Sequence, residues 1–275
     1  MSHLTNAQPD GTPTWIDLRV AEYDRTLEFY GALFGWEYAE EPTSAGGRRN
    51  ATCLLHGKPV AAITQAPATT GFGWTMYIAT ADCDGTAKRI ADAGGTLLEE
   101  PVDVMAGGTL LEEPVDDMAG GARVAVAEDS VGARFGLWQA RTRIGCEIVN
   151  EPGSLVRNDL LTPTPGPARA FYSAVFGYTL DLNDVMPEAD FTFLRRPDGH
   201  EIGGIFGIPK PSTPTPASTP TSAWATTFEV ADTDAVAQQA TASGGTSTTP
   251  EDIPYGRIAT ITDPNGNEFS VITRP

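Results

Sequence analysis

The sequence repeats itself across its two halves. Three pairs of segments match in the same order: 29–36 (FYGALFGW) with 171–178 (FYSAVFGY), 94–96 (GGT) with 244–246 (GGT), and 123–135 with 257–269. Because the order is kept and only the spacing between the segments differs, the chain consists of two homologous halves with loops of different length. A binding or catalytic site is therefore expected at paired positions of the two halves.

Length and composition indicate two ordinary globular domains. A chain of 275 residues with 40% apolar residues provides roughly 130 residues for each half, enough for a core in each. No apolar run approaches the roughly 20 residues of a membrane span, and the first residues lack the pattern of a signal peptide, so a cytoplasmic protein is expected. The three cysteines form no CxxC pair, which argues against a disulfide framework and a cysteine-built zinc site.

The charge balance restricts the partners. Eighteen basic and 36 acidic residues give a net charge of −18, which repels nucleic acid and anionic lipid and attracts small cations. We therefore predict neither a nucleic-acid nor a membrane partner. Solubility alone is the simpler explanation of such a charge.

The hydrophobic pattern predicts an α+β fold. A strand at 14–20, a helix at 24–34 and three short strands at 37–40, 51–55 and 59–63 form one βαβββ unit. The same order recurs three more times, which gives four units. We divide the chain into an N-terminal tail (1–13), a first domain (14–140), a linker (141–153) and a second domain (154–275). The Pro-, Ser- and Thr-rich tract at 209–221 is predicted to connect the third and fourth units, with a lid over a cavity as the alternative.

A second, local duplication lies inside the first domain. Residues 94–106 (GGTLLEEPVDVMA) are followed at once by the nearly identical residues 107–119, both within 94–119. The second half has one counterpart of this segment, so one copy suffices for the fold. Because an odd insertion in a strand turns every later side chain to the other face, we expect one copy to be looped out.

These motifs resemble those of the vicinal oxygen chelate superfamily, which includes glyoxalase I, bleomycin-resistance proteins and extradiol dioxygenases. The resemblance rests on FYGALFGW at 29–36, DCDG at 82–85, AGG at 93–95 and DPNGN at 263–267, and it spans both halves. It resembles in particular the tandem actinobacterial members. The resemblance implies that the four units form two incompletely closed barrels, each with a concave interior. It leaves open whether a cavity closes within one half or between the first and fourth units.

In enzymes of this superfamily the concave interior holds a divalent metal on His or Glu side chains. The corresponding positions here are Trp15, Trp74, Gly136, Arg157, Trp224 and Ser270. None of these side chains replaces a His or carboxylate ligand. We therefore predict no metal, no cofactor and no catalytic residue at these positions.

Aromatic side chains at ligand positions suggest a different use of the cavity. An indole stacks on planar aromatic molecules and attracts a cation placed over its face. The predicted ligand-binding residues are Trp15, Asp17, Trp74, Arg123, Trp138, Asp159, Trp224, Arg257 and Ser270. The alternatives are that the indoles fill the barrels, that the aspartates make structural hydrogen bonds and that the arginines pair with carboxylates. Trp36 and Tyr178 are expected to pack in the core.

Two functions follow from this pattern. The first is a binding protein rather than an enzyme, which sequesters a planar aromatic and cationic small molecule, such as an anthracycline-like antibiotic, for self-resistance or for antibiotic biosynthesis. The second is an enzyme of the same superfamily, a metal-dependent lyase, isomerase or dioxygenase or a metal-free enzyme that uses Asp17 or Asp159 as a base. Because the chain is already an internal dimer, we expect a monomer or a weak homodimer.

Overall fold

The computed structural model describes residues 3–40, 49–67, 73–104, 121–182, 189–209 and 222–275. The first half contains β1 (Pro13–Val20), α1 (Tyr23–Phe34), β2 (Glu37–Glu40), β3 (Asn50–Leu55), β4 (Lys58–Gln65), β5 (Trp74–Ala79), α2 (Cys83–Asp92), β6 (Thr96–Val104), β7 (Ala122–Glu128) and β8 (Arg134–Ala140). The second half contains β9 (Leu155–Thr162), α3 (Pro165–Phe176), β10 (Thr179–Leu182), β11 (Phe191–Arg195), β12 (Glu201–Gly207), β13 (Ala223–Glu229), α4 (Thr233–Ala242), β14 (Thr246–Ser247), β15 (Glu251–Ile253), β16 (Gly256–Thr262) and β17 (Glu268–Thr273).

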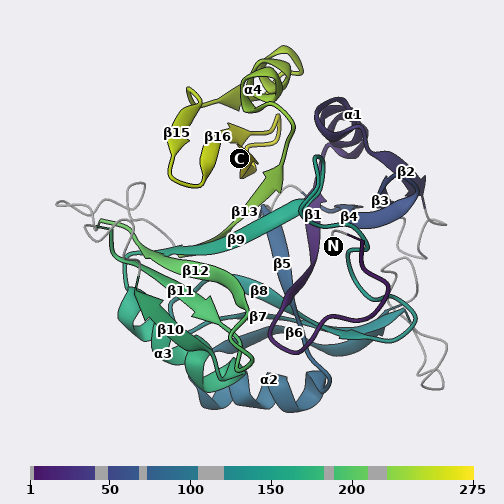
Figure 1. The fold of residues 1–275 in the computed structure, drawn as a ribbon. Coiled ribbons are helices and arrows are strands. Elements are labelled where there is room, and N and C mark those ends of the chain that lie inside the picture. Colours follow the sequence, from purple (N-terminus) through teal and green to yellow (C-terminus); the bar gives the residue numbers. More distant parts are fainter. Residues whose placement is uncertain (1–2, 41–48, 68–72, 105–120, 183–188, 210–221) are drawn as a thin grey trace.

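Each half folds into one large, open sheet (Figure 1). The strand order is β2-β3-β4-β1-β5-β8-β7-β6 in the first half, and β10-β11-β12-β9-β13-β17-β16-β14 in the second, where β15 also pairs with β16. Two βαβββ units share each sheet, joined by the antiparallel pairs β1–β5 and β9–β13. The α+β prediction with four units and two open barrels is confirmed, and each concave face forms within one half. No helix in the described segments is long and apolar enough to cross a membrane.

Local sequence signals set the ends of the helices. Gly35 and Gly177 end α1 and α3 in the left-handed conformation, with φ angles of 69° and 70° that favour glycine. Asp82 and Asp232 begin α2 and α4, where their carboxylates accept hydrogen bonds from backbone N–H groups of the first turn. The two halves therefore use the same residue types to begin and end their equivalent helices.

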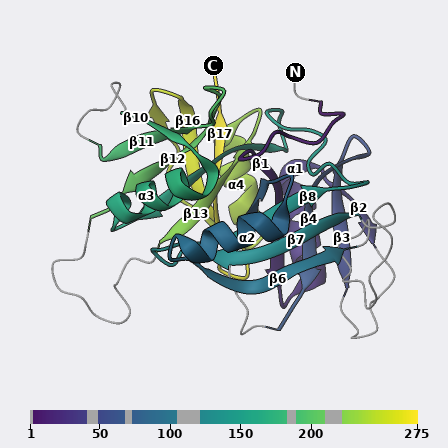
Figure 2. The same cartoon turned by 90° about the horizontal axis from the view of Figure 1, so that it is seen from below.

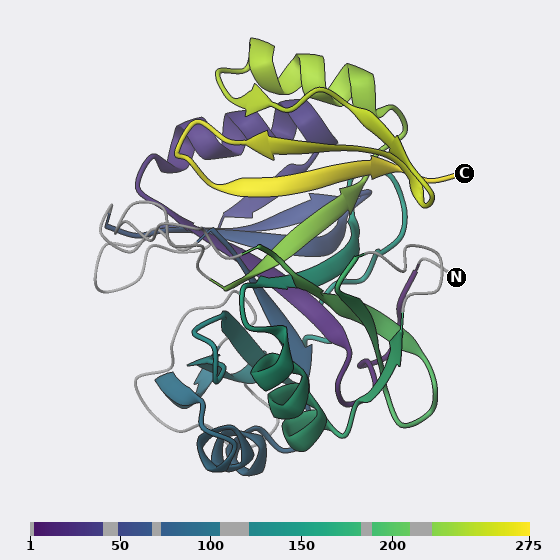
Figure 3. The same cartoon turned by 90° about the vertical axis from the view of Figure 1, so that its left-hand side faces the viewer.

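The helices pair across the two halves. Figures 2 and 3 show α2 beside α3 at one end of the molecule, and Figure 3 shows α1 beside α4 at the other. One continuous core of buried side chains lies between the sheets and helices of both halves. The predicted core residues Trp36 and Tyr178 belong to this core. Each of them also donates a hydrogen bond to a glycine carbonyl that precedes the first strand of the other half: Trp36 to Gly153 at 2.7 Å and Tyr178 to Gly11 at 2.6 Å.

The first copy of the local duplication supplies a strand. Residues of this copy form β6, which pairs antiparallel with β7. The whole second copy, residues 107–119, lies within residues 105–120, outside the described residues. The expectation that one copy is looped out therefore falls on residues that the structure does not describe, and so does most of the tract at 209–221.

Candidate functional site

Trp74 and Trp224 lie in the core between the halves, not on a concave face. Both indoles belong to the large core, with 5% and 6% exposure, and each donates its N–H to a buried tyrosine hydroxyl: Trp74 to Tyr30 at 3.1 Å and Trp224 to Tyr172 at 2.7 Å. The neighbouring residue of each strand takes the opposite face, because side chains alternate along a strand. The residues of β5 and β13 that face the concave side are therefore Thr75 and Ala225. The prediction from the sequence, which placed Trp74 and Trp224 there, was wrong by one residue in each strand.

Tyr30 and Tyr172 each connect their indole to a carboxylate of the opposite half. The Tyr30 hydroxyl donates to Asp263 at 3.2 Å, and the Tyr172 hydroxyl donates to Asp129 at 2.9 Å. Burial, together with the nearby carboxylate, raises the pKa of both hydroxyl groups well above the ordinary value, so that both remain proton donors. These two Trp–Tyr–Asp networks are related by the internal repeat, and they join the halves.

The concave face of the first half is filled by three aromatic rings. Trp15 and Trp138 lie 5.4 Å apart between ring centroids, and Tyr77 meets Trp138 edge-on at 6.1 Å. All three rings are at most 4% exposed. The guanidinium group of Arg143, from the segment between the halves, lies 4.9 Å from the centre of the Trp15 ring. The structure thus brings Trp15 and Trp138 together as a packed pair, which agrees with the alternative that the indoles fill the barrel.

Gly136 explains how the Tyr77 ring fits. A Cβ atom on Gly136 would lie 2.1 Å from Cδ1 of Tyr77, so the missing side chain leaves the space that this ring occupies. In the second half, a Cβ atom on Gly204 would lie 2.2 Å from Cζ of Phe191. Glycine therefore makes room for an aromatic ring on both concave faces, although at different strands.

Asp17 lies beside the aromatic cluster of the first half. Its Oδ2 atom accepts a hydrogen bond from the Tyr77 hydroxyl at 2.7 Å, whereas its Oδ1 atom is shielded from solvent and has no hydrogen-bond partner among the described residues. Arg19, on the same strand, is bound in bidentate fashion by Glu99 at 2.6 and 3.1 Å. Burial raises the pKa of the Asp17 carboxyl, and Arg19 only partly opposes this effect.

The second half presents a more open concave face. Phe191, Phe193 and Phe206 are half-buried, with Phe191 5.0 Å from Phe193 and 6.1 Å from Phe206 between ring centroids. The Arg157 guanidinium lies 5.7 and 5.6 Å from the centres of the Phe191 and Phe193 rings. These phenyl rings were missed in the sequence, although the alternation of Phe191 and Phe193 in FTFLR marks two rings on one face of a strand.

Charged and hydroxyl groups border these rings. Arg157 donates to Asp159 at 2.9 and 2.7 Å and to Glu201 at 2.7 Å, while its Nη2 atom has no hydrogen-bond partner in the described part of the chain. Ser270 is paired with Thr227 of β13 and Thr260 of β16, and paired residues on adjacent strands share a face. Asp159 and Ser270 thus lie on this concave face.

Arg123 and Arg257 hold helix ends and lie away from the concave faces. Arg123 donates to Asp84 in the first turn of α2 at 2.8 and 2.9 Å, and Arg257 donates to Asp234 in the first turn of α4. These bonds lower the pKa of both carboxyl groups. Both arginines thus pair with carboxylates, which was the alternative to a ligand-binding role.

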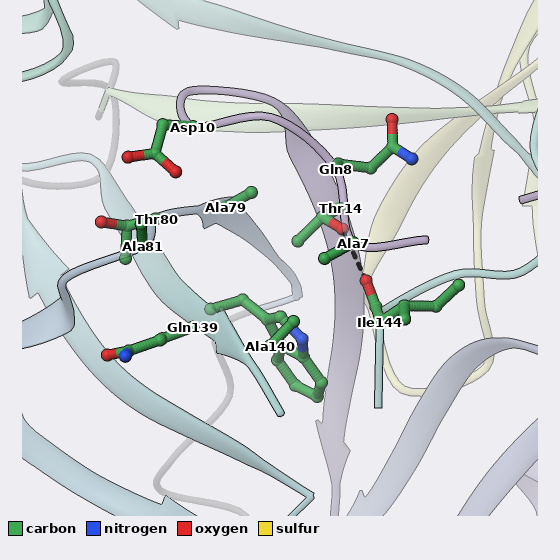
Figure 4. Close-up of a pocket in the computed structure, with 11 residues that line it drawn as sticks. Ala7, Gln8, Asp10, Thr14, Ala79, Thr80, Ala81, Gln139, Ala140 and Ile144 are labelled. Atoms are coloured by element: carbon green, nitrogen blue, oxygen red, sulfur yellow. Dashed lines mark hydrogen bonds between the residues drawn. The ribbon is translucent and has the colours of Figure 1, made fainter. Parts of the chain in front are cut away.

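A pocket of about 290 Å³ opens at the end of the first concave face (Figure 4). Its walls come from the N-terminal segment, from the ends of β1, β5 and β8, and from the residues after β8. Asp10, Thr80 and Gln139 lie on one side of the view and Gln8, Thr14 and Ile144 on the other. Of the predicted ligand-binding residues, Trp138 alone is among the described residues that line this pocket.

The described residues contain no group of three or more His, Cys, Asp or Glu side chains placed to hold a metal ion. The concave residues at the positions where relatives carry metal ligands are Trp15, Thr75 and Gly136 in the first half, and Arg157, Ala225 and Ser270 in the second. Thr75 and Ala225 replace the tryptophans of the sequence comparison, and neither is a ligand for a divalent transition metal in the pattern of this fold. The donor set therefore does not fit such an ion at these positions.

The fold and the paired units place the chain in a known class. It belongs to the Glyoxalase/Bleomycin resistance protein/Dioxygenase superfamily, whose profile matches residues 12–120 and 154–271. CFP32 of Mycobacterium tuberculosis, provisionally named a glyoxylase, is 35% identical to the chain and the match covers 95% of this chain and 94% of CFP32. The anthracycline biosynthesis protein DnrV of Streptomyces peucetius is 31% identical, with 95% and 93% covered. The manganese-bound glyoxalase from Novosphingobium aromaticivorans shares the fold at 15% identity, with a TM-score of 0.62 over 96% of this chain and 82% of that chain.

Proposed function

We propose that this protein binds a flat aromatic, positively charged small molecule on the concave face of its second half, without a metal ion. The observation on which this rests is the group of half-buried rings Phe191, Phe193 and Phe206 beside the Arg157–Asp159 pair. Half-exposed phenyl rings on a concave surface offer a platform for stacking. In the first half, the corresponding region is filled by Trp15, Tyr77 and Trp138 and leaves less room for a ligand.

The polar groups on this face suit a ring system that bears oxygen atoms. The Nη2 atom of Arg157 remains available as a donor to a carbonyl or phenolate oxygen, and its bonds to Asp159 and Glu201 fix its orientation. The hydroxyl groups of Thr227, Ser270 and Thr260 border the same face. A fused-ring quinone or phenol therefore matches both the stacking platform and the donors.

Charge supports a cationic ligand. On this face, the three carboxylates of Asp159, Asp181 and Glu201 meet the two guanidinium groups of Arg157 and Arg195, which leaves one net negative charge. The whole chain carries a net charge of −18, which raises the local concentration of small cations. The relative DnrV is named for anthracycline biosynthesis, and an anthracycline combines a flat ring system with an amino sugar. We propose an anthracycline-like ligand, held for self-resistance or as an accessory step in biosynthesis.

Titration with the anthracycline daunorubicin, followed by ligand fluorescence, tests this proposal. We expect saturable binding that weakens when the amino sugar is absent. The Phe193→Ala variant should lose about 1 to 3 kcal/mol of binding free energy, the range for an anchoring aromatic side chain. Leu182→Ala is the matched control, because Leu182 lies on the neighbouring edge strand with 79% exposure and points away from the concave face. Absence of saturable binding, or equal losses in both variants, contradicts the proposal.

A metal-free enzyme is the second candidate, and Asp17 favours it. Its shielded Oδ1 atom has no hydrogen-bond partner and its pKa is raised, which are properties of a general base. Incubation of the protein with aromatic hydroxy compounds, followed by mass spectrometry, tests this candidate; a product that forms with the parent and is lost in Asp17→Asn supports it. Stoichiometric zinc, iron, nickel or manganese in protein purified without a chelator contradicts both metal-free functions.

A further inference from the structure

A separate pocket lies at the end of the first concave face, in the half of the molecule that the proposed function does not use. Its volume is about 290 Å³, at the lower end of the range for small-molecule sites. It lies beneath the N-terminal segment, which the sequence marked as a tail (Figure 4). The following inference rests on this pocket and is independent of the proposed function.

The N-terminal segment is a fixed wall of the pocket. Gly11 N–H donates to the carbonyl of Ala79 at 2.8 Å, and Ala79 N–H donates to the carbonyl of Thr12 at 2.8 Å. Further along, Leu4 N–H donates to the carbonyl of Glu147 at 2.8 Å. Tyr178 of the second half adds its hydrogen bond to the carbonyl of Gly11 at 2.6 Å. Bonds at both ends of the segment, from both halves of the chain, thus preserve the shape of the pocket.

The lining combines one charge with an apolar floor. Asp10 is the one charged residue among the described residues that line the pocket, and it lies on the same side of the pocket as Thr80 and Gln139. The apolar contacts come from Ala79, Trp138 and Ile144. A single carboxylate in a pocket that also has apolar walls favours a molecule that has a positive charge at one end and a hydrophobic body at the other.

We propose that this pocket is a second binding site, for a small organic cation whose ammonium group pairs with Asp10 and whose apolar body contacts Ala79, Trp138 and Ile144. The size of the pocket restricts the ligand to about one ring, which separates it from the fused-ring ligand of the second half. Trp138 provides a direct reporter, because it lines the pocket and its indole N–H donates to the carbonyl of Arg143, the residue before the lining residue Ile144.

Three one-ring probes of similar shape test the charge preference: benzylamine, benzyl alcohol and benzoate. Each is titrated into the full-length, ¹⁵N-labelled protein, and the resonances of the Trp138 indole and of the backbone amides of Asp10 and Thr80 are followed. We expect saturable shifts with benzylamine, binding about fivefold weaker with benzyl alcohol, as for the loss of an exposed ion pair, and weaker binding still with benzoate.

Asp10→Asn and Asp92→Asn form a matched pair of variants. Both remove one negative charge from an exposed position, but Asp92 lies in α2 outside the pocket lining. Asp10→Asn should reduce the affinity for benzylamine to that for benzyl alcohol, and Asp92→Asn should leave it unchanged. Equal affinities for the three probes, shifts confined to other residues, or equal losses in the two variants would overturn the proposal. Daunorubicin binding to Asp10→Asn is measured in parallel: if it is retained while benzylamine binding is lost, the two sites are distinct.

Discussion

The Trp224–Tyr172–Asp129 network offers a direct test of how the halves are held together. Replacing Tyr172 by Phe keeps the ring and removes its hydroxyl, which donates to Asp129 at 2.9 Å and accepts from Trp224 at 2.7 Å. Tyr172 is fully buried and Asp129 is 4% exposed, so water cannot replace the lost partners without a rearrangement. Asp129 keeps the bonds from the backbone N–H groups of Val131 and Ala133.

The magnitude follows from the two lost hydrogen bonds. A bond to a charged acceptor contributes about 1.5 to 3 kcal/mol, and a buried donor without a partner, here the Trp224 N–H, costs about 1 to 3 kcal/mol. Because the two losses share one hydroxyl, we expect the free energy of unfolding to fall by about 3 kcal/mol. That is a large part of the roughly 5 to 15 kcal/mol by which proteins are stable.

The assay is urea unfolding followed by tryptophan fluorescence and by circular dichroism. Tyr38→Phe is the matched control, since its hydroxyl donates to the neutral carbonyl of Leu27 at 2.7 Å and its loss should cost only about 1 kcal/mol. The double variant Tyr172→Phe with Trp224→Phe removes the donor that the single change leaves without a partner. We therefore expect the double variant to lose less unfolding free energy than the sum of the losses in the two single variants.

Two results would refute this reasoning. A Tyr172→Phe variant as stable as the parent would show that the network contributes nothing to joining the halves. A Trp224→Phe variant that loses as much daunorubicin affinity as Phe193→Ala would show that this indole contacts ligand, although it lies in the core.

Three further predictions concern other parts of the molecule. Asp17→Asn should gain stability relative to the parent as the pH rises from acid to neutral. Burial raises the pKa of the Asp17 carboxyl in the folded protein, so the parent loses stability as the pH rises from the unfolded to the folded pKa, whereas the variant has no such group. Parallel pH profiles of unfolding free energy in the two proteins would contradict this prediction. Deletion of residues 107–119 should keep the fold and change the unfolding free energy by less than about 1 kcal/mol, since the first copy already forms β6; loss of the native circular dichroism spectrum would argue otherwise. Arg123→Ala should cost about 1 kcal/mol or less in thermal unfolding and leave daunorubicin affinity intact, because its partner Asp84 is an exposed carboxylate in the first turn of α2, away from the concave faces; a large loss of affinity would return Arg123 to the ligand site.

The repeated motifs determined the number and order of the units. Matching segments in the two halves placed four βαβββ units on the chain, and the glycines and aspartates at the helix ends had the conformations that such residues favour. Trp15 and Trp138 were also placed on a concave face from the sequence, because the strand anchors around them are clear. These are local features, encoded by periodicity and by capping residues.

The faces of Trp74 and Trp224 were not determined by the sequence. Every residue of β5, which begins at Trp74, is buried, so the strand shows no alternation of polar and apolar residues from which a face could be read. A shift of one residue then turns the indole from the concave face to the core. The pattern of the strand allowed both orientations, and packing against Tyr30 and Tyr172 selected one.

The contacts between the halves also required the tertiary structure. The sequence by itself determined the units, their order and their caps, because each depends on residues within one turn or one strand. Only the tertiary structure decided that α1 lies beside α4, that tyrosines of one half bind aspartates of the other, and that the N-terminal segment closes a pocket. The physical reason is that these contacts join residues far apart along the chain, and the burial of the shared core selects among the arrangements that the local pattern permits.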